Sequence, residues 1–225
     1  MDFLTLAEKR CTTRGFTGER IPDTDLKRIL SAGRVAPTAC NKQPQRIIVV
    51  KRTENIEKVQ KAYQTFGSSC ILIVCRDRRN ELIRPYDMKC SGDLDIGIIC
   101  DHMMLAAREL DIGSVMVGLF DPAVIRSGFM LPEYIEPVAL LFLGYPSKGF
   151  SSPQRHETER KKLENTVFYE AYRIDQACGW SRSPCRSSVS PGEPGRHDFF
   201  YKLWLYKRIG PFRGKPGKQA DFFYL

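Results

Sequence analysis

The chain has 225 residues, enough for one substantial domain or for one domain with an extension. Hydrophobic residues make up 42% of the chain and charged residues 27%, which is typical of a folded protein and argues against wholesale disorder. No window approaches the roughly 18 apolar residues of a membrane span. The start of the chain also lacks the basic and apolar pattern of a secretory signal. We therefore expect a cytoplasmic protein without membrane contact.

The net charge of +9 is concentrated in the last fifty residues. Residues 1–175 hold 26 basic and 23 acidic side chains, whereas residues 176–225 hold 9 and 3. We expect one domain over residues 1–175, followed by a basic, aromatic, Gly/Pro-rich tail over residues 176–225. The tail is interpreted as a disordered extension, an arm packed on another subunit, or sequence foreign to the domain. Its interleaved basic and aromatic residues would suit single-stranded nucleic acid, but the balanced charge of the body argues against that partner.

Hydrophobic periodicity predicts alternating helices and strands along the first 150 residues. An N-cap at Asp23 or Thr24 is expected to open the second helix, which Pro37 ends. The apolar run at residues 70–75 shows no polar alternation, so this strand should be buried on both faces. Asp121 and Pro122 are expected to cap a short helix. Helices are expected at residues 5–10, 24–36, 55–63, 93–110 and after 121, and strands at 46–50, 70–75, 114–119 and 137–143. This alternation favours a sheet between two layers of helices.

The residues suited to metal binding or acid–base chemistry are few and scattered. Eight cysteines form no C-x-x-C pair, and there are three histidines, one of them in the tail. We read the cysteines as small buried hydrophobic residues. We expect no metal site, no catalytic triad and no catalytic side chain.

Four local features suggest a binding site instead. Residues 36–45 carry two prolines around Thr38, Asn41 and Gln43, and their amides suit the edge of a heteroaromatic ring. Residues 10–16 form a basic turn in which guanidinium and hydroxyl groups could hold a phosphate. Residues 114–118 form a strand end of small residues that a flat ligand could approach closely. Residues 155–164 add late basic side chains.

In this order and spacing, the four features resemble the FMN-dependent nitroreductase family over about residues 3–172. Residues 9–16 are similar to its opening turn, R-R-S-x-R-x-F, and residues 36–44 to its A-P-[ST]-x-x-N-x-Q-P loop. The start and middle of its long central helix are matched by residues 91–96 and 102–107. The match continues through residues 113–118, 120–122, 131–140 and 143–146.

The resemblance implies an α+β, three-layer sandwich with a central mixed or antiparallel sheet. It also implies a homodimer formed through the long central helix, with FMN sites shared between the subunits. By family role, Arg10, Thr12 and Arg14 would hold the phosphate and ribityl chain, with Arg160 as a late phosphate ligand. The flavin ring would be approached by Pro37, Thr38, Asn41 and Gln43 and by the backbone around Val117 and Gly118. Cys11 stands where the family usually has Arg or His, so one phosphate contact is missing.

The resemblance further implies an FMN-dependent NAD(P)H:acceptor oxidoreductase. In its two-step cycle, NAD(P)H reduces the flavin, and a small-molecule acceptor such as a nitroaromatic or a quinone then takes the electrons. Residues 76–92 are expected to form a lid. Alternatives within the same fold are dehalogenation, reduction of unsaturated substrates and flavin breakdown. A non-catalytic flavin carrier, or an interaction protein that uses its basic tail, stays open as well.

Overall fold

A computed structural model describes residues 1–172 of the chain. Residues 1–160 form one compact unit, and residues 161–172 belong to a second unit that is described by itself. In that second unit, residues Leu163–Asn165 form a short 3₁₀ helix (η2), and the rings of Phe168 and Tyr172 lie 4.6 Å apart. The expected domain boundary after residue 175 and the tail at residues 176–225 lie outside the described residues.

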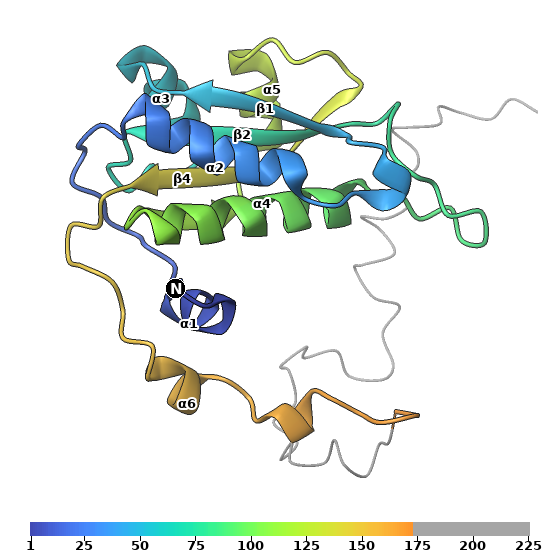
Figure 1. Cartoon of the computed structure of the whole chain (residues 1–225). Helices are drawn as coiled ribbons and strands as arrows, with labels where there is room; N and C mark the ends of the chain where they lie inside the picture. Colours follow the sequence, from blue (N-terminus) through green and yellow to red (C-terminus); the bar gives the residue numbers. More distant parts are fainter. Residues whose placement is uncertain (173–225) are drawn as a thin grey trace, which may run out of the picture. The chain divides into compact units, whose positions relative to one another are not determined.

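A four-stranded sheet forms the centre of the first unit (Figure 1). Its strands are β1 (Gln45–Val50), β2 (Cys70–Asp77), β3 (Gly113–Val117) and β4 (Ile135–Gly144). The spatial order is β1-β2-β4-β3, and every neighbouring pair is antiparallel. The four predicted strands are confirmed, and the sheet is antiparallel rather than mixed.

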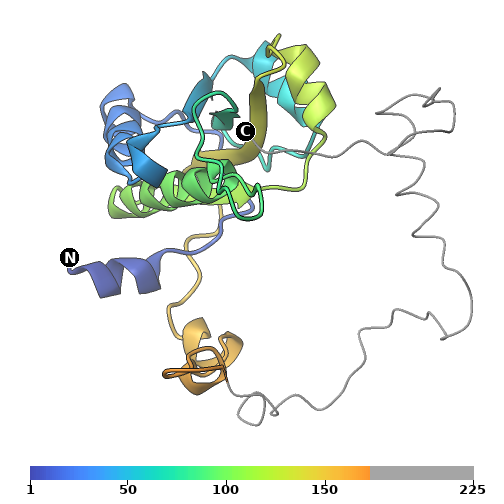
Figure 2. The same cartoon turned by 90° about the vertical axis from the view of Figure 1, so that its right-hand side faces the viewer.

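Helices cover both faces of this sheet, as Figures 1 and 2 show from two sides. The helices α2 (Asp23–Val35) and α4 (Gly92–Glu109) pack on one face, and α3 (Thr53–Gln60) and α5 (Pro122–Gly128) on the other. The remaining helices are α1 (Phe3–Lys9), α6 (Arg155–Glu159) and the 3₁₀ turn η1 (Ala39–Asn41). The predicted three-layer α+β fold is therefore confirmed. In residues 1–172, no helix is both long and apolar enough to cross a membrane.

The core explains why β2 carries an unbroken apolar run. Leu72 and Val74 face the cluster beneath α2 and α4, whereas Ile71 and Ile73 face the cluster beneath α3 and α5. Every residue from 70 to 75 is buried, as predicted. A strand that contributes to both cores has no solvent face, so polar alternation is absent from its sequence.

Two helix starts show how well caps are read from sequence. The side chain of Asp121 accepts hydrogen bonds from the backbone N–H groups of Ala123 and Val124, as predicted for a cap before Pro122. The predicted cap at Asp23 or Thr24 is wrong, because Pro22 occupies the N-cap and Asp23 is the first helical residue of α2. Proline can precede a helix without a penalty because its missing N–H would have no helical partner there.

The α2 and α4 helices approach closely at Gly33. A Cβ atom at this position would stand 2.8 Å from Cγ of the fully buried Met103. We expect Gly33→Val to overpack this contact and to lower the free energy of unfolding by about 1–3 kcal/mol, measured by urea denaturation. The control is Ser31→Val, which adds the same side chain at an exposed position of the same helix. Equal stability of the two variants would contradict the predicted close packing.

Candidate functional site

The basic turn at residues 10–16 lies along the edge strand β3. Thr12 pairs with Ser114 in parallel, and the backbone N–H of Thr13 donates to the carbonyl of Ser114 (3.0 Å). The Thr13 side chain packs over Gly113, where a Cβ atom would stand only 2.8 Å from Thr13 Oγ1. A residue with a larger side chain at position 113 would therefore push the turn off the strand. The structure thus joins two predicted features, the basic turn and the small-residue strand, that lie a hundred residues apart in the sequence.

The turn also forms one wall of a hollow of about 200 Å³. Its lining consists of residues 11–15, 147–149 and 151. Thr13 is 7% exposed, and its Oγ1 atom is buried without a hydrogen-bond partner in the described part of the chain. A buried hydroxyl without a partner costs free energy, which the close packing of Thr13 over Gly113 imposes here. The guanidinium groups of Arg10 and Arg14 have no ion pair within residues 1–172 and stay available to an anion.

Cys11 is buried at 4% exposure and contributes no charge to the turn. The turn is instead braced by two arginines that the sequence did not single out for this purpose. Arg108 donates from Nε to the carbonyl of Lys9 (3.1 Å), and Arg155 donates from Nη2 to the carbonyl of Arg10 (3.0 Å). The predicted late ligand, Arg160, follows α6 with an exposed side chain. The spacing of the basic residues gave no signal that would separate Arg155 from Arg160.

The loop at residues 37–43 has an unusual backbone. Cys40, Asn41 and Gln43 all have positive φ values, of 48°, 52° and 50°. Residues with a Cβ atom rarely adopt this left-handed conformation, which costs free energy at each position. Several such residues in one short loop persist only where the surroundings hold them, and they cluster at functional sites.

Two buried carboxylates hold this loop in place. Asp95 of α4 is 1% exposed and accepts hydrogen bonds from the backbone N–H of Ala39 (2.9 Å) and from Ser91 Oγ (2.8 Å). Asp77 accepts a hydrogen bond from Arg46 (3.2 Å), and Arg46 in turn donates to the carbonyl of Gln43 (3.2 Å). Both ends of the loop are therefore anchored through charged side chains.

Inside the loop, Thr38 Oγ1 accepts a hydrogen bond from the backbone N–H of Gln43 (3.1 Å). The Gln43 amide nitrogen lies 3.3 Å from the carbonyl of Asn41. The side chains of Pro37, Asn41 and Gln43 are exposed. Polar groups on a fixed backbone are thus presented to the exterior, as a binding loop requires.

The end of β3 offers an open approach to the backbone. Val117 is 7% exposed, and no atom of the described residues lies within 4 Å of where a Cβ of Gly118 would stand. This strand was predicted to reach residue 119, but β3 ends at Val117, and Leu119 is 83% exposed. The free space beside Gly118 is compatible with a flat ligand lying against the chain.

Residues 76–92, which we expect to form a lid, are not all loop, because Arg76 and Asp77 belong to β2 and Gly92 belongs to α4. The excursion between them, residues 78–91, is pinned at its base by Arg76. Arg76 forms ion pairs with Glu81, Asp93 and Glu136. Burial lowers the pKa of Arg76, but Glu136 and Asp93 outweigh burial and raise it above its usual value. A hollow of about 350 Å³ lies beside the excursion and is lined by Ala39, Leu82, Arg84, Lys89, Cys90, Ser91 and Leu94.

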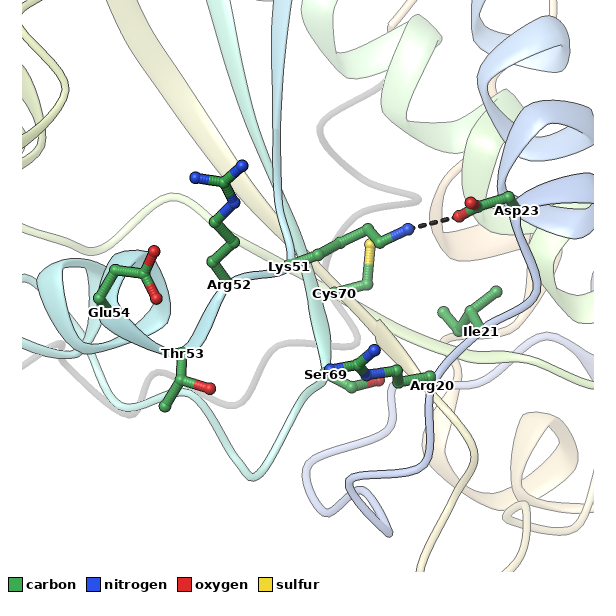
Figure 3. Close-up of a pocket in the computed structure, with 9 residues that line it drawn as sticks. All are labelled: Arg20, Ile21, Asp23, Lys51, Arg52, Thr53, Glu54, Ser69 and Cys70. Carbon is green, nitrogen blue, oxygen red and sulfur yellow. Dashed lines mark hydrogen bonds and ion pairs between the residues drawn. The ribbon is translucent and has the colours of Figure 1, made fainter.

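Another hollow, of about 510 Å³, lies near the C-terminal end of β1 (Figure 3). Its lining carries both signs of charge, and Lys51 already forms an ion pair with Asp23. At its floor, burial raises the pKa of the Cys70 thiol to about 11, which leaves the thiol protonated and unreactive near neutral pH. The chemistry of this hollow therefore favours no particular ligand.

The structure keeps two of the predicted features apart within one chain. The loop at residues 37–43 is attached to α4 at Asp95, and the basic turn is attached to the same helix at Arg108. These attachment points are thirteen residues apart, or about 20 Å along a helix.

Comparisons with known proteins identify the family of the chain. The model of the nitroreductase family matches residues 7–68 and 66–145. The chain belongs to the nitroreductase family. A crystal structure of a nitroreductase family protein from Clostridium difficile 630 is 41% identical in sequence, with a TM-score of 0.75. The match covers 76% of this chain and 100% of that one.

Two curated relatives extend the comparison within the nitroreductase family. A protein of Archaeoglobus fulgidus with the provisional name NADH dehydrogenase/NAD(P)H nitroreductase is 34% identical over 152 residues. The alignment covers 64% of this chain and 84% of the relative. An FMN reductase [NAD(P)H] of Bacillus subtilis is 24% identical over 174 residues, covering 68% of this chain and 69% of the relative. These names support an oxidoreductase.

Asp77 makes the stability of the binding loop dependent on pH. Hydrogen bonds from Arg79 lower the pKa of Asp77 from 3.8 to about 2, against the opposing effect of burial, and Arg46 contributes further. A lowered native pKa stabilises the fold above pH 4, and this stabilisation is lost as the pH falls from about 4 to about 2. We expect Asp77→Asn to flatten the fall of the melting temperature in that range. Glu57→Gln, at an exposed position of α3, should retain the wild-type slope. Parallel pH profiles for the wild type and Asp77→Asn would contradict this role of Asp77.

Proposed function

We propose that the chain is an FMN-dependent NAD(P)H:acceptor oxidoreductase. The observation that carries this proposal is the attachment of the basic turn to β3 through Thr13 and Ser114. It brings unpaired cations and the open backbone at Gly118 onto the same edge strand. Ser114 and Gly118 are four residues apart, or about 13 Å along a strand. One strand edge thus offers a place for a phosphate and a place for a flat ring.

The residues present fit FMN. At the turn, Arg10, Thr12 and Arg14 would hold the phosphate and the ribityl chain, and residues 11–15 line a hollow beside them. Arg160 is proposed as a late phosphate ligand. At the ring, Val117 and Gly118 would present backbone, and the loop with Pro37, Thr38, Asn41 and Gln43 would present its amide and hydroxyl groups.

The chemistry that FMN supplies when bound is the transfer of a hydride from NAD(P)H to an oxidised acceptor. The protein's own contribution is to bind, to orient and to exclude water. The positive φ values at Asn41 and Gln43 fix the amides before a ligand arrives, which lowers the entropic cost of binding. No side chain is required as a nucleophile or a general base for this role.

We further propose a homodimer whose FMN sites combine the turn of one chain with the loop of its partner. The separation of Asp95 and Arg108 along α4, about 20 Å, supports this arrangement, because the two features are attached to opposite ends of one helix. Exposed apolar side chains give further support. Phe3 and Leu4 of α1 are 72% and 66% exposed, and Leu94 of α4 is 68% exposed. A second subunit would remove this apolar surface from water.

The acceptor is proposed to be a small oxidised molecule, such as a nitroaromatic or a quinone, and the compartment to be the cytoplasm. The apolar lining of the hollow beside residues 78–91, with Leu82 and Leu94, favours an aromatic acceptor. Dehalogenation, reduction of unsaturated substrates and flavin breakdown would use the same flavin site. Acceptor choice depends on variable loops rather than on the fold.

The first test is an absorbance spectrum of the purified protein, followed by addition of NADH and then NADPH without air. We expect the bands of oxidised flavin, which bleach when a reduced nicotinamide is added. Reoxidation by nitroaromatics and quinones would then identify the acceptor class. A protein that stays colourless after addition of FMN would contradict the proposal, and bound flavin that no nicotinamide reduces would point to a carrier.

The shared site is tested by complementation between two variants. We expect Arg14→Glu and Asn41→Ala each to lose most of the bound FMN, since one damages the turn and the other the loop. A dimer with one chain of each kind would contain one intact site and one doubly damaged site. Co-expression with two different affinity tags should therefore restore about half of the wild-type flavin content. If each site were built within one chain, mixed dimers would recover no flavin.

A further inference from the structure

We propose that Lys148 binds the phosphate of FMN together with Arg14, an inference that rests on the proposed function. The chain after β4 runs back along the basic turn. Phe16 pairs antiparallel with Pro146, and the backbone N–H of Ser147 donates to the carbonyl of Gly15 (3.0 Å). Arg14 and Lys148 are the next residues of the two segments beyond this hydrogen bond.

Both residues line the hollow of about 200 Å³ beside the turn. The residues that line it include two with cationic side chains and none with a carboxylate. Thr12, Ser147 and Ser151 add residues with hydroxyl groups. Cations and hydroxyl donors around a small hollow are suited to a phosphate group.

The charge at this hollow has no counterpart within the described residues. Arg76, Arg79 and Arg84 illustrate the usual arrangement, in which each cation forms an ion pair with a nearby carboxylate. Arg14 and Lys148 have no such pair within residues 1–172, although both line the same hollow. Like charges close to each other repel and destabilise the fold. A dianion bound between them would attract both cations and so offset their repulsion. The planar guanidinium of arginine and the compact ammonium of lysine are both suited to binding it.

Lys148 also accounts for the loss of charge at Cys11. The position where the family usually has Arg or His carries a buried thiol here. The positive charge is supplied instead by Lys148, because residues 145–148 run back alongside the turn. Lys148 is thus a binding residue that replaces the missing contact from across the hollow.

The test compares FMN with riboflavin, which lacks the phosphate. We expect Lys148→Ala to weaken FMN binding about ten-fold, the equivalent of one charge-assisted hydrogen bond, and to leave riboflavin binding unchanged. Lys148→Arg should retain most of the FMN affinity. Lys27→Ala, at an exposed position of α2, is the control. Dissociation constants come from quenching of flavin fluorescence, and melting temperatures of the apoproteins show whether each variant is folded.

An unchanged FMN dissociation constant, or equal losses for both flavins, would overturn the proposal. A loss of NADPH affinity relative to NADH, with FMN affinity intact, would also overturn it, because the phosphate would then belong to the nicotinamide cofactor. If the wild type binds neither flavin, the proposed function fails. Inorganic phosphate is then added to the wild type and to Lys148→Ala to test the anion site separately. Changes in the backbone amide NMR chemical shifts of residues 11–15 and 147–149 that are smaller in Lys148→Ala would support the site. The absence of such changes in the wild type would overturn it.

Discussion

The rest of the structure depends on the buried helix α4, which fixes two loops at points about 20 Å apart. Near its start, Asp95 holds the backbone of Ala39, and near its end, Arg108 holds the carbonyl of Lys9. Its middle is packed against α2 and the sheet, with Ile96, Ile99 and Met103 fully buried. Both loops are therefore attached to one helix that is packed against α2 and the sheet.

The two loops are stabilised by different physical means. The loop at residues 37–43 has an unfavourable backbone conformation, which buried carboxylates and Arg46 hold in place. The basic turn has an ordinary backbone but an excess of positive charge, which no carboxylate within the described residues neutralises. Strain and unpaired charge both cost stability, and proteins accept such costs where a ligand offsets them. Their presence at two sites predicted to bind one cofactor supports a common function.

The separation of these loops within one chain gives the proposed dimer a functional reason. In the proposed dimer, a second subunit would bring the phosphate clamp of one chain and the ring-binding loop of the other together. The exposed apolar side chains of α1 and α4 have a place in this proposal, since the dimer that buries them would also form the shared flavin sites. Binding of cofactor and assembly of subunits would thus stabilise one another.

Some features of the fold could be predicted from the sequence, and others became visible only in the tertiary structure. The unbroken apolar run of β2, the cap at Asp121 and the motifs at residues 9–16 and 36–44 are local patterns. The order of elements, the three-layer fold and the family could therefore be predicted from them. The cap of α2 was missed, because Asp23 and Pro22 both suit a helix start and local chemistry does not rank them.

What the sequence left open depends on contacts between residues far apart in the chain. The roles of Asp95, Asp77 and Arg155 were not predicted, because a carboxylate or a guanidinium on a helix or strand looks the same in the sequence whether it faces water or a distant loop. Arg14 and Lys148 line the same hollow because the chain after β4 pairs with the basic turn at Phe16 and Pro146, a contact that the sequence does not encode locally. The sequence by itself determined which chemical groups the protein has and in which elements they lie. Only the tertiary structure decided which of them meet, because burial and pairing arise when distant segments pack together.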